Sequence, residues 1–307
     1  MSGKLYVVGT PIGNLEDMSV RAVKTLQEVD FIAAEDTRVT LKLLNHFEIK
    51  KPMVSYHEHN AREKGGEIIT HLLSGQTCAI VTDAGMPCIS DPGEDLVRLC
   101  AENGIDTVVI PGPSAAISAL ALSGLSTSKF VFEGFLNPQK NARLERLEEL
   151  KREKRTIIFY EAPHKLCDTL SAMYQVLGDR KITLARELTK IYEEVIRTTL
   201  SQAVALFEEK APKGEFVLVV EGMVEEEQSL TFEQALELIR RLSIRESLFP
   251  KQQRMLPVRP DSKKESCTPV FWQSKAVNYI KNRSFLSNFC TQKFVGVRGQ
   301  RPCDTQK

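Results

Sequence analysis

The chain has 307 residues, of which 42% are hydrophobic and 26% are charged, as in an ordinary globular protein. This length is enough for two domains that each bury a core of their own. No apolar run approaches the roughly 20 residues that a membrane-spanning helix needs. A strand-like segment begins at residue 5 and leaves no room for a signal peptide, so we expect a cytoplasmic protein that does not enter the membrane.

The net charge of +1 conceals an uneven distribution along the chain. Residues 244–307 hold 13 Lys and Arg against 4 Asp and Glu, which gives a net charge of +9. The preceding 243 residues carry a net charge of −8. Any basic surface in this larger part must therefore be local, because the part as a whole repels polyanions.

Residues 4–125 alternate between strand-like and helix-like segments. Short apolar runs predict strands at 5–9, 31–34, 53–56, 77–82 and 107–110. The segments between them have helical periodicity and predict helices near 19–27, 39–46, 61–73 and from the loop at 83–93 to about 103. Apolar strands separated by helices predict a parallel sheet covered on both faces. A helix of small residues at 115–122 is expected to close this unit.

The remainder predicts a second α/β unit and a tail. The expected strands lie at 130–133, 156–160, 181–185 and 216–221, and the expected helices near 141–151, 165–177 and 202–209; the stretch at 194–200 has no assigned type. We therefore predict an N-terminal α/β domain over 1–124 with a mostly parallel sheet, and a second, mixed α/β domain over 125–224. The segment 225–307 begins with a helical pattern and continues as a basic, proline-containing stretch that we expect to be disordered.

Four loops rich in Gly, Pro and Asp follow predicted strands of the first unit, at 9–14, 35–38, 83–93 and 111–114. In an open parallel sheet, ligands bind outside the carboxyl ends of the strands, where such loops converge. One such loop is more easily explained as a tight turn, but four together predict a binding cleft. The chain has no Gly-x-Gly-x-x-Gly, Walker or Gly-x-Ser-x-Gly motif, which disfavours NAD binding, ATP hydrolysis and esterase chemistry.

Seven ordered motifs between residues 4 and 222 resemble those of the ribosomal RNA small-subunit methyltransferase I family, within the tetrapyrrole-methylase-like superfamily. They are Val8-Gly9-Thr10-Pro11-Ile12-Gly13-Asn14-Leu15, Ala34-Glu35-Asp36-Thr37-Arg38, Val81-Thr82-Asp83-Ala84-Gly85-Met86-Pro87 with Ile89-Ser90-Asp91-Pro92-Gly93, Pro111-Gly112-Pro113-Ser114-Ala115, Phe159-Tyr160-Glu161, Ala185-Arg186-Glu187-Leu188-Thr189-Lys190 and Gly214-Glu215.

The resemblance implies a two-domain tetrapyrrole-methylase-like fold, a homodimer, and S-adenosylmethionine held in the cleft between the domains. It further implies 2′-O-methylation of a decoding-centre cytidine in the 16S rRNA of the small ribosomal subunit. Carried over from the superfamily, the expected cofactor contacts are Pro11, Asp83, Ala84, Gly85, Met86, Ser114 and Ala115. For Asp83, capping of the following turn is the alternative role.

The expected substrate-side residues are ionisable. Methyl transfer from a sulfonium is an in-line displacement that depends on alignment, and a weakly nucleophilic ribose hydroxyl needs help in losing its proton. Glu35, Asp36 and Arg38 follow an apolar strand, and Asp36 or Glu35 is the candidate base; a surface ion pair with a helix N-cap is the alternative. Glu187 and Lys190 of the second domain are candidates for the same cleft, and a structural ion pair is equally compatible with them.

Other charged residues suggest contacts with RNA. The segment 140–155 is rich in Lys and Arg and predicts an RNA-binding helix, although interleaved glutamates also fit a solvated helix with internal ion pairs. The basic tail would add non-specific affinity. His57, Glu58 and His59 are better explained as a solvated loop than as metal ligands, and the seven cysteines form no Cys-x-x-Cys pair. No metal is therefore expected.

Two positions and one segment depart from the family pattern. Cys88 replaces a usual Gly, Lys165 replaces an Arg, and the segment after about residue 242 lacks the family's usual Ala/Lys-rich end, which suggests a divergent terminus or a shifted reading frame. Two rival functions remain: a tetrapyrrole C-methyltransferase or diphthine synthase of the same fold, and a non-catalytic RNA-binding factor.

Overall fold

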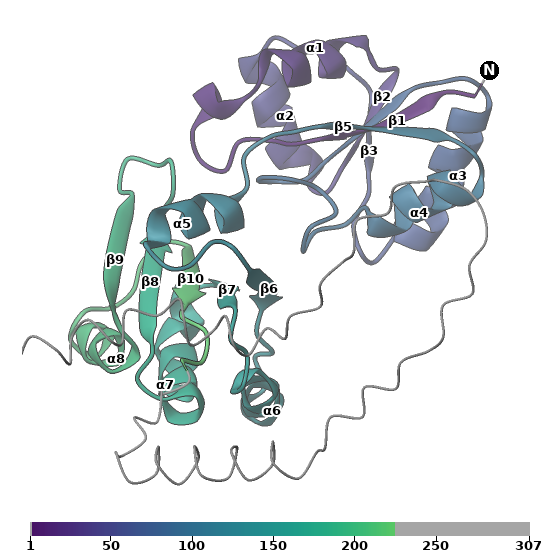
Figure 1. Ribbon diagram of the computed structural model, residues 1–307. Coiled ribbons are helices and arrows are strands. Elements are labelled where there is room, and N and C mark those ends of the chain that lie inside the picture. The colour runs from purple at the N-terminus through teal and green to yellow at the C-terminus, as the bar shows by residue number, and fades with distance from the viewer. Residues whose placement is uncertain (1, 225–307) are drawn as a thin grey trace, which may run out of the picture. The chain divides into compact units, whose positions relative to one another are not determined.

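A computed structural model of the protein describes residues 2–224, which contain two five-stranded sheets (Figure 1). The first sheet has the order β3-β2-β4-β1-β5, and all its neighbouring strands are parallel. Because β2 and β4 are buried along their whole length, they are apolar on both faces. The strands are β1 (Lys4–Val8), β2 (Phe31–Ala34), β3 (Met53–Ser55), β4 (Cys78–Val81) and β5 (Asp106–Ile110).

Two pairs of helices cover the two faces of this sheet (Figure 1). Since side chains alternate along a strand, Leu5 and Val7 of β1 belong to the core under α3 and α4, whereas Val8 belongs to the core under α1 and α2. The predicted parallel sheet with two covered faces is thus confirmed. The helices are α1 (Val20–Glu28), α2 (Thr37–His46), α3 (Ala61–Leu73) and α4 (Glu94–Glu102), with a short 3-10 turn, η1 (Leu15–Asp17), before α1.

The second sheet is mixed, with the order β6-β7-β10-β8-β9. Only β6 and β7 run parallel, and the other neighbours are antiparallel. The predicted combination of a parallel sheet and a mixed second sheet is therefore confirmed. The strands are β6 (Phe130–Phe135), β7 (Thr156–Glu161), β8 (Lys181–Arg186), β9 (Glu194–Thr199) and β10 (Phe216–Val220).

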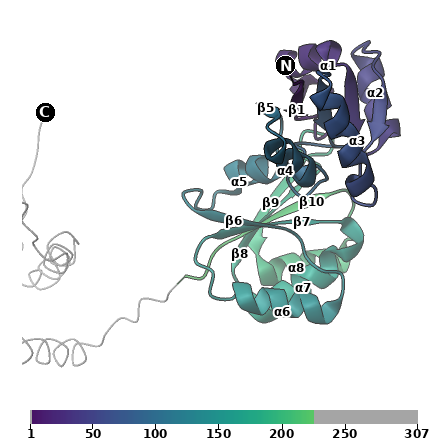
Figure 2. The same ribbon diagram turned by 90° about the vertical axis from the view of Figure 1, so that its right-hand side faces the viewer.

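Three helices cover one face of the second sheet, and α5 (Ala115–Ser123) packs on the other (Figure 2). Ala116 and Leu120 of α5 share a core with Val217 of β10. The expectation that this helix closes the first unit is therefore corrected: its apolar surface is buried on the second sheet. The three helices are α6 (Lys140–Leu150), α7 (Leu166–Leu177), which follows the 3-10 turn η2 (Pro163–Lys165), and α8 (Leu200–Glu209).

The boundary predicted between residues 124 and 125 remains a prediction, and the predicted tail, 225–307, lies outside the described residues. Within residues 2–224, no helix combines the length and the apolar character needed to cross a membrane.

Candidate active site

The loops that follow β1, β4 and β5 contact one another through their backbones. Thr10 and Gly85 form an antiparallel bridge, in which the N–H of each donates to the carbonyl of the other, at 2.8 and 3.2 Å. A Cβ on Gly9 would lie 2.7 Å from the Cα of Gly112, so no side chain fits at this crossing. The three loops are thereby fixed at the carboxyl edge of the sheet, where the sequence predicted a cleft.

A cavity of about 320 Å³ opens beside these loops and is lined by residues of both sheets. The first sheet contributes backbone-rich loop segments, and the second contributes aromatic and charged side chains. Phe135 and Tyr160 stack edge to face with ring centroids 5.5 Å apart, and the Tyr160 hydroxyl accepts a hydrogen bond from Ala116 N at 3.2 Å. Most of the expected site residues line this cavity, namely Glu35, Asp83, Ala84, Gly85, Met86, Ser114, Ala115, Glu187 and Lys190.

One wall of the cavity is acidic. The Thr82 hydroxyl donates a hydrogen bond of 2.5 Å to Glu35 Oε2, and Asp83 and Asp91 lie on the same wall. Burial, reinforced by the charge of Glu35, raises the pKa of Asp83. The same two causes raise the pKa of Asp91 to about 6. The negative charge of this wall attracts a cation, and Asp91, with its pKa of about 6, exchanges its proton near neutral pH.

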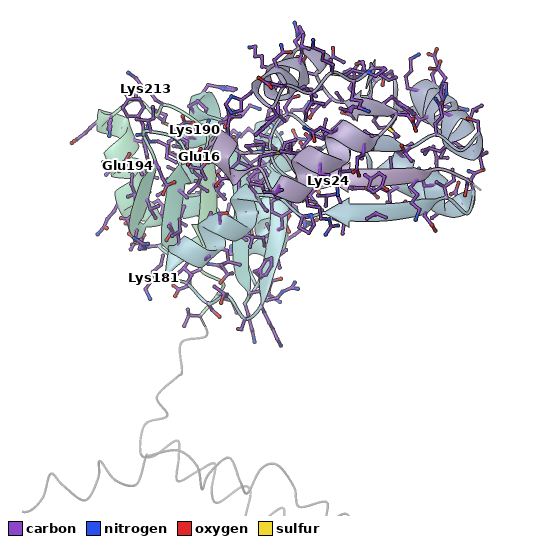
Figure 3. All side chains as sticks on the ribbon, turned by 90° about the horizontal axis from the view of Figure 1, so that it is seen from above. Glu16, Lys24, Lys181, Lys190, Glu194 and Lys213 are labelled. Atoms are coloured by element: carbon purple, nitrogen blue, oxygen red, sulfur yellow. The ribbon has the colours of Figure 1, made fainter. Side chains whose placement is uncertain are left out.

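The loop between β8 and β9 and the residue before β10 add an ion-pair network to the lining of the cavity. Lys190 Nζ donates to Glu187 Oε1 at 2.9 Å and to Glu215 Oε2 at 3.1 Å. Glu187 also accepts from Glu215 N at 3.0 Å, and this bond, together with Lys190, lowers the Glu187 pKa. Although partial burial opposes it, hydrogen bonding to Glu187 and Glu215 raises the Lys190 pKa. Figure 3 shows Lys190 at the opposite end of β8 from Lys181.

This loop is also conformationally strained. Glu187 and Thr189 have φ angles of 52° and 64°, which non-glycine residues seldom adopt. Hydrogen bonds hold both residues in this conformation. Glu187 Oε1 accepts from Glu215 N, and Thr189 N donates to Glu193 Oε2 at 2.6 Å. Cys88 has a φ of 69°, so the Gly that the family pattern has at this position avoids a strain that Cys must bear.

A second cavity of about 430 Å³ adjoins the first. Pro11, an expected cofactor contact, lines this second cavity and is absent from the first. The two cavities have six lining residues in common, which are Ile12, Thr82, Asp83, Ala84, Lys190 and Glu215.

Asp36 and Arg38 line neither cavity. Asp36 is the N-cap of α2, where its carboxylate accepts from Arg38 N at 2.8 Å and pairs with the Arg38 guanidinium at 2.6 Å. These bonds to Arg38 lower the Asp36 pKa to about 2, and the Arg38 side chain is 88% exposed. The geometry thus matches the alternative role, a surface ion pair with a helix cap. The Asp36 N–H still donates to Asp83 Oδ1 at 3.2 Å, which ties the cap to the cavity wall.

Three residues that line the first cavity, Asp91, Phe135 and Tyr160, are not among the expected site residues. Asp91 and Tyr160 do fall within the recognised motifs. The glycine two residues after Asp91 is a sequence signal of a tight loop, and in the structure this residue, Gly93, has a positive φ. Phe135 carries no sequence signal, because it reaches the cavity only through the bulge between Phe132 and Gly134 in β6.

The basic run on α6 is largely occupied by ion pairs. Arg146 pairs with Glu133 and Glu149, Lys151 pairs with Glu148, and Arg143 is buried. This arrangement matches the solvated-helix alternative better than an RNA-binding surface. Across residues 2–224, no group of three or more His, Cys, Asp or Glu side chains is placed to hold a metal ion.

The family model for Tetrapyrrole (Corrin/Porphyrin) Methylases matches residues 4–204. Over 220 residues, the chain is 56% identical to the Ribosomal RNA small subunit methyltransferase I of Halalkalibacterium halodurans, which covers 72% of this chain and 76% of the relative. The chain belongs to the ribosomal RNA small subunit methyltransferase I family. The resemblance expected from the seven motifs is thereby confirmed, and the pocket residues above belong to a methyltransferase of this family.

Two solved structures show how widely the fold of the ribosomal RNA small subunit methyltransferase I family is shared. A cobalt precorrin-4 methyltransferase of cobalamin biosynthesis is 18% identical with a TM-score of 0.54, covering 71% of this chain and 94% of that chain. A uroporphyrin-III C-methyltransferase from Thermus thermophilus, complexed with S-adenosylhomocysteine, is 18% identical with a TM-score of 0.50. The match covers 71% of this chain and 97% of that chain. At such identity the likeness concerns the fold.

Proposed function

We propose that this protein transfers the methyl group of S-adenosylmethionine to the ribose 2′-hydroxyl of a decoding-centre cytidine in 16S rRNA. The observation that carries this proposal is the pair of adjoining cavities with Asp83 in their common wall. One cavity has room for the methyl donor and the other for the acceptor, and the carboxylate between them can take the proton of the hydroxyl. Family membership supplies the substrate class.

The first cavity suits S-adenosylmethionine by its chemistry. Gly85 has a φ of 90°, so backbone rather than side chain faces the cavity beside Ala84 and Met86. The acidic wall offers hydrogen-bond acceptors to the ammonium group and negative charge to the sulfonium, and Tyr160 and Phe135 offer apolar surface to the adenine. When bound, S-adenosylmethionine supplies a methyl group on a cationic sulfur. The solved uroporphyrin-III C-methyltransferase with S-adenosylhomocysteine supports this choice of donor.

Asp83 and Glu35 are the candidates for the general base. Asp36 accepts protons poorly because its pKa is about 2, and the raised pKa of Lys190 keeps this side chain protonated. The raised pKa of Asp83 makes it a better proton acceptor than Asp36. The N–H of Asp83 donates to Glu35 Oε2 at 3.4 Å, so Glu35 lies beside Asp83. Glu187 and Lys190 hold the β8–β9 loop against the cavity and act as positioning residues.

The test supplies radiolabelled S-adenosylmethionine to the purified protein with two acceptors in parallel: small ribosomal subunits from cells that lack this protein, and a precorrin. We expect label in the 16S rRNA, at one cytidine that is resistant to alkaline cleavage because its 2′-oxygen is methylated. Label in the precorrin and none in the RNA would refute the proposal. Calorimetry with S-adenosylmethionine addresses the remaining rival, since a non-catalytic RNA-binding factor would bind RNA and give no heat with the cofactor.

We further propose that the protein works as a homodimer in the cytoplasm, on the RNA of the small ribosomal subunit. Large apolar side chains at the surface support the homodimer: Val109 on the edge strand β5, and Ile117 and Leu122 on α5, are among the exposed hydrophobic residues. A second copy of the chain would remove them from water.

A further inference from the structure

The lining of the second cavity includes a buried hydroxyl that has no hydrogen-bond partner among the described residues. Thr40 lines this cavity, is 3% exposed, and its Oγ1 has no hydrogen-bond partner among the described residues. Thr25 in α1 and Thr70 in α3 behave differently, because each donates to the carbonyl four residues earlier, at 2.8 and 2.9 Å. A buried polar group left unpaired costs free energy. The hydroxyl of Thr40 is therefore an unused donor and acceptor just beneath the surface of the cavity, and a rotation about χ1 would present it to a ligand.

The rest of the lining combines apolar surface with one cation. Leu15, Val39 and Leu43 line the cavity, and the first two are partly exposed. Lys42, one turn along α2 from Arg38, lies in the same lining and forms no ion pair with any described residue. These three features suit the three parts of a nucleotide. The apolar side chains can contact the flat face of the base, the hydroxyl can bond to the sugar, and the ammonium of Lys42 can pair with a phosphate.

The position of this cavity agrees with that chemistry. It shares the lining residues Asp83 and Ala84 with the first cavity, so a sugar bound in it lies next to the methyl donor's cavity. Lys190 and Glu215 also line both cavities. An RNA base inside a duplex cannot enter a pocket of about 430 Å³, whereas a nucleotide turned out of the strand can.

We propose that the second cavity is the acceptor subsite: it receives one RNA nucleotide turned out of its strand, with Thr40 hydrogen-bonded to the nucleotide and Lys42 paired with an adjacent phosphate. This inference rests on the proposed function and adds where the RNA binds.

The first test replaces Thr40 with Val, which has the same shape without the hydroxyl. We expect the KM for small ribosomal subunits to rise about three- to tenfold, as loss of one neutral hydrogen bond implies, while the Kd for S-adenosylmethionine is unchanged. Thr40→Ser keeps a hydroxyl and should restore the wild-type KM. Thr25→Val is the matched control, because its hydroxyl bonds within its own helix, and its KM should not change.

If the Thr40 hydroxyl has no ligand, Thr40→Val removes an unpaired buried group, so the melting temperature rises and the KM stays at the wild-type value. That result would overturn the acceptor subsite. The wild-type measurement separates the two proposals: a wild type that does not methylate the ribose refutes the function, whereas an active wild type with unaffected Thr40→Val and Lys42→Ala variants refutes only the subsite.

The second test changes an exposed residue and so does not depend on how the core tolerates substitution. Lys42→Ala should weaken RNA binding and lower the slope of log affinity against log salt by about one, as expected for a lost phosphate contact. Lys24→Ala is the control: Lys24, which is labelled on α1 in Figure 3, already pairs with Glu28 at 3.8 Å. An identical slope for Lys42→Ala and wild type would contradict the phosphate contact.

Discussion

Neighbouring carboxylates in this protein differ because of the atoms around them. Glu35 and Asp36 are adjacent in the chain, yet Glu35 joins the acidic wall through Thr82 and Asp36 caps α2. Asp83 has a raised pKa because it is partly buried beside Glu35, and Asp36 has a lowered one because Arg38 binds it. The sequence alone predicts that both lie past β2, but their roles depend on where the helix begins.

Substitution of these carboxylates should separate the base from the cap. We expect Asp83→Asn to lower kcat by about 100-fold or more, the usual contribution of a general base. Asp36→Asn should leave kcat within about twofold, because Asn caps helices as well as Asp does. Single-turnover methyl transfer at saturating cofactor measures both. Equal losses in the two variants would contradict this division of roles.

The raised pKa of Asp91 predicts a pH-dependent stability. The folded pKa is about 6 and the ordinary value is 3.8, so the folded state holds its proton to higher pH than the unfolded state does. The stabilising effect of this proton is complete below about pH 4 and is lost as the pH rises through 6. Asp91→Asn imitates the protonated form. We therefore measure the melting temperature of Asp91→Asn minus that of wild type as a function of pH. This difference should increase between about pH 4 and pH 6 and stay level above pH 6, and a constant difference across this range would contradict the raised pKa.

At the scale of elements, the site depends on loops that touch through glycine. The crossing of Gly9 and Gly112 has no room for a Cβ. Gly9→Ala must push the β1 and β5 loops apart, so we expect a loss of about 1–3 kcal/mol in the free energy of unfolding, together with weaker cofactor binding. Gly66→Ala is the control: it lies in α3 with nothing within 4 Å of the added carbon, and should gain about 0.5–1 kcal/mol. Urea titration and calorimetry measure the two effects.

Periodicity predicts most elements of this fold, and it fails where a helix lacks a polar face. The strands and helices of the first unit appear within a few residues of their expected positions, because each strand is bounded by glycine, proline or a cap. In contrast, α5 consists of small apolar residues around its whole circumference, so its sequence does not reveal which sheet it covers. The residues that the motifs missed, such as Phe135, reach the site through a bulge that depends on tertiary packing.

At the scale of the whole molecule, exposed apolar side chains predict a dimer. Ile117 and Leu122 lie on the outside of α5, whose inner face covers the second sheet. A double substitution, Ile117→Glu with Leu122→Glu, should convert the dimer into a monomer in light scattering without lowering the melting temperature of the protomer. Leu73→Glu is the control, since Leu73 is exposed at the end of α3, and should not change the mass. A wild-type mass of one protomer would contradict the dimer.

The wall shared by the two cavities has a consequence for inhibitor design. Because the two cavities adjoin and share the lining residues Asp83 and Ala84, a single compound that joins an adenosine analogue to a cytidine analogue through a short tether would occupy both at once. Each half would hold the other at a high effective concentration, so the linked molecule should bind far more tightly than either half.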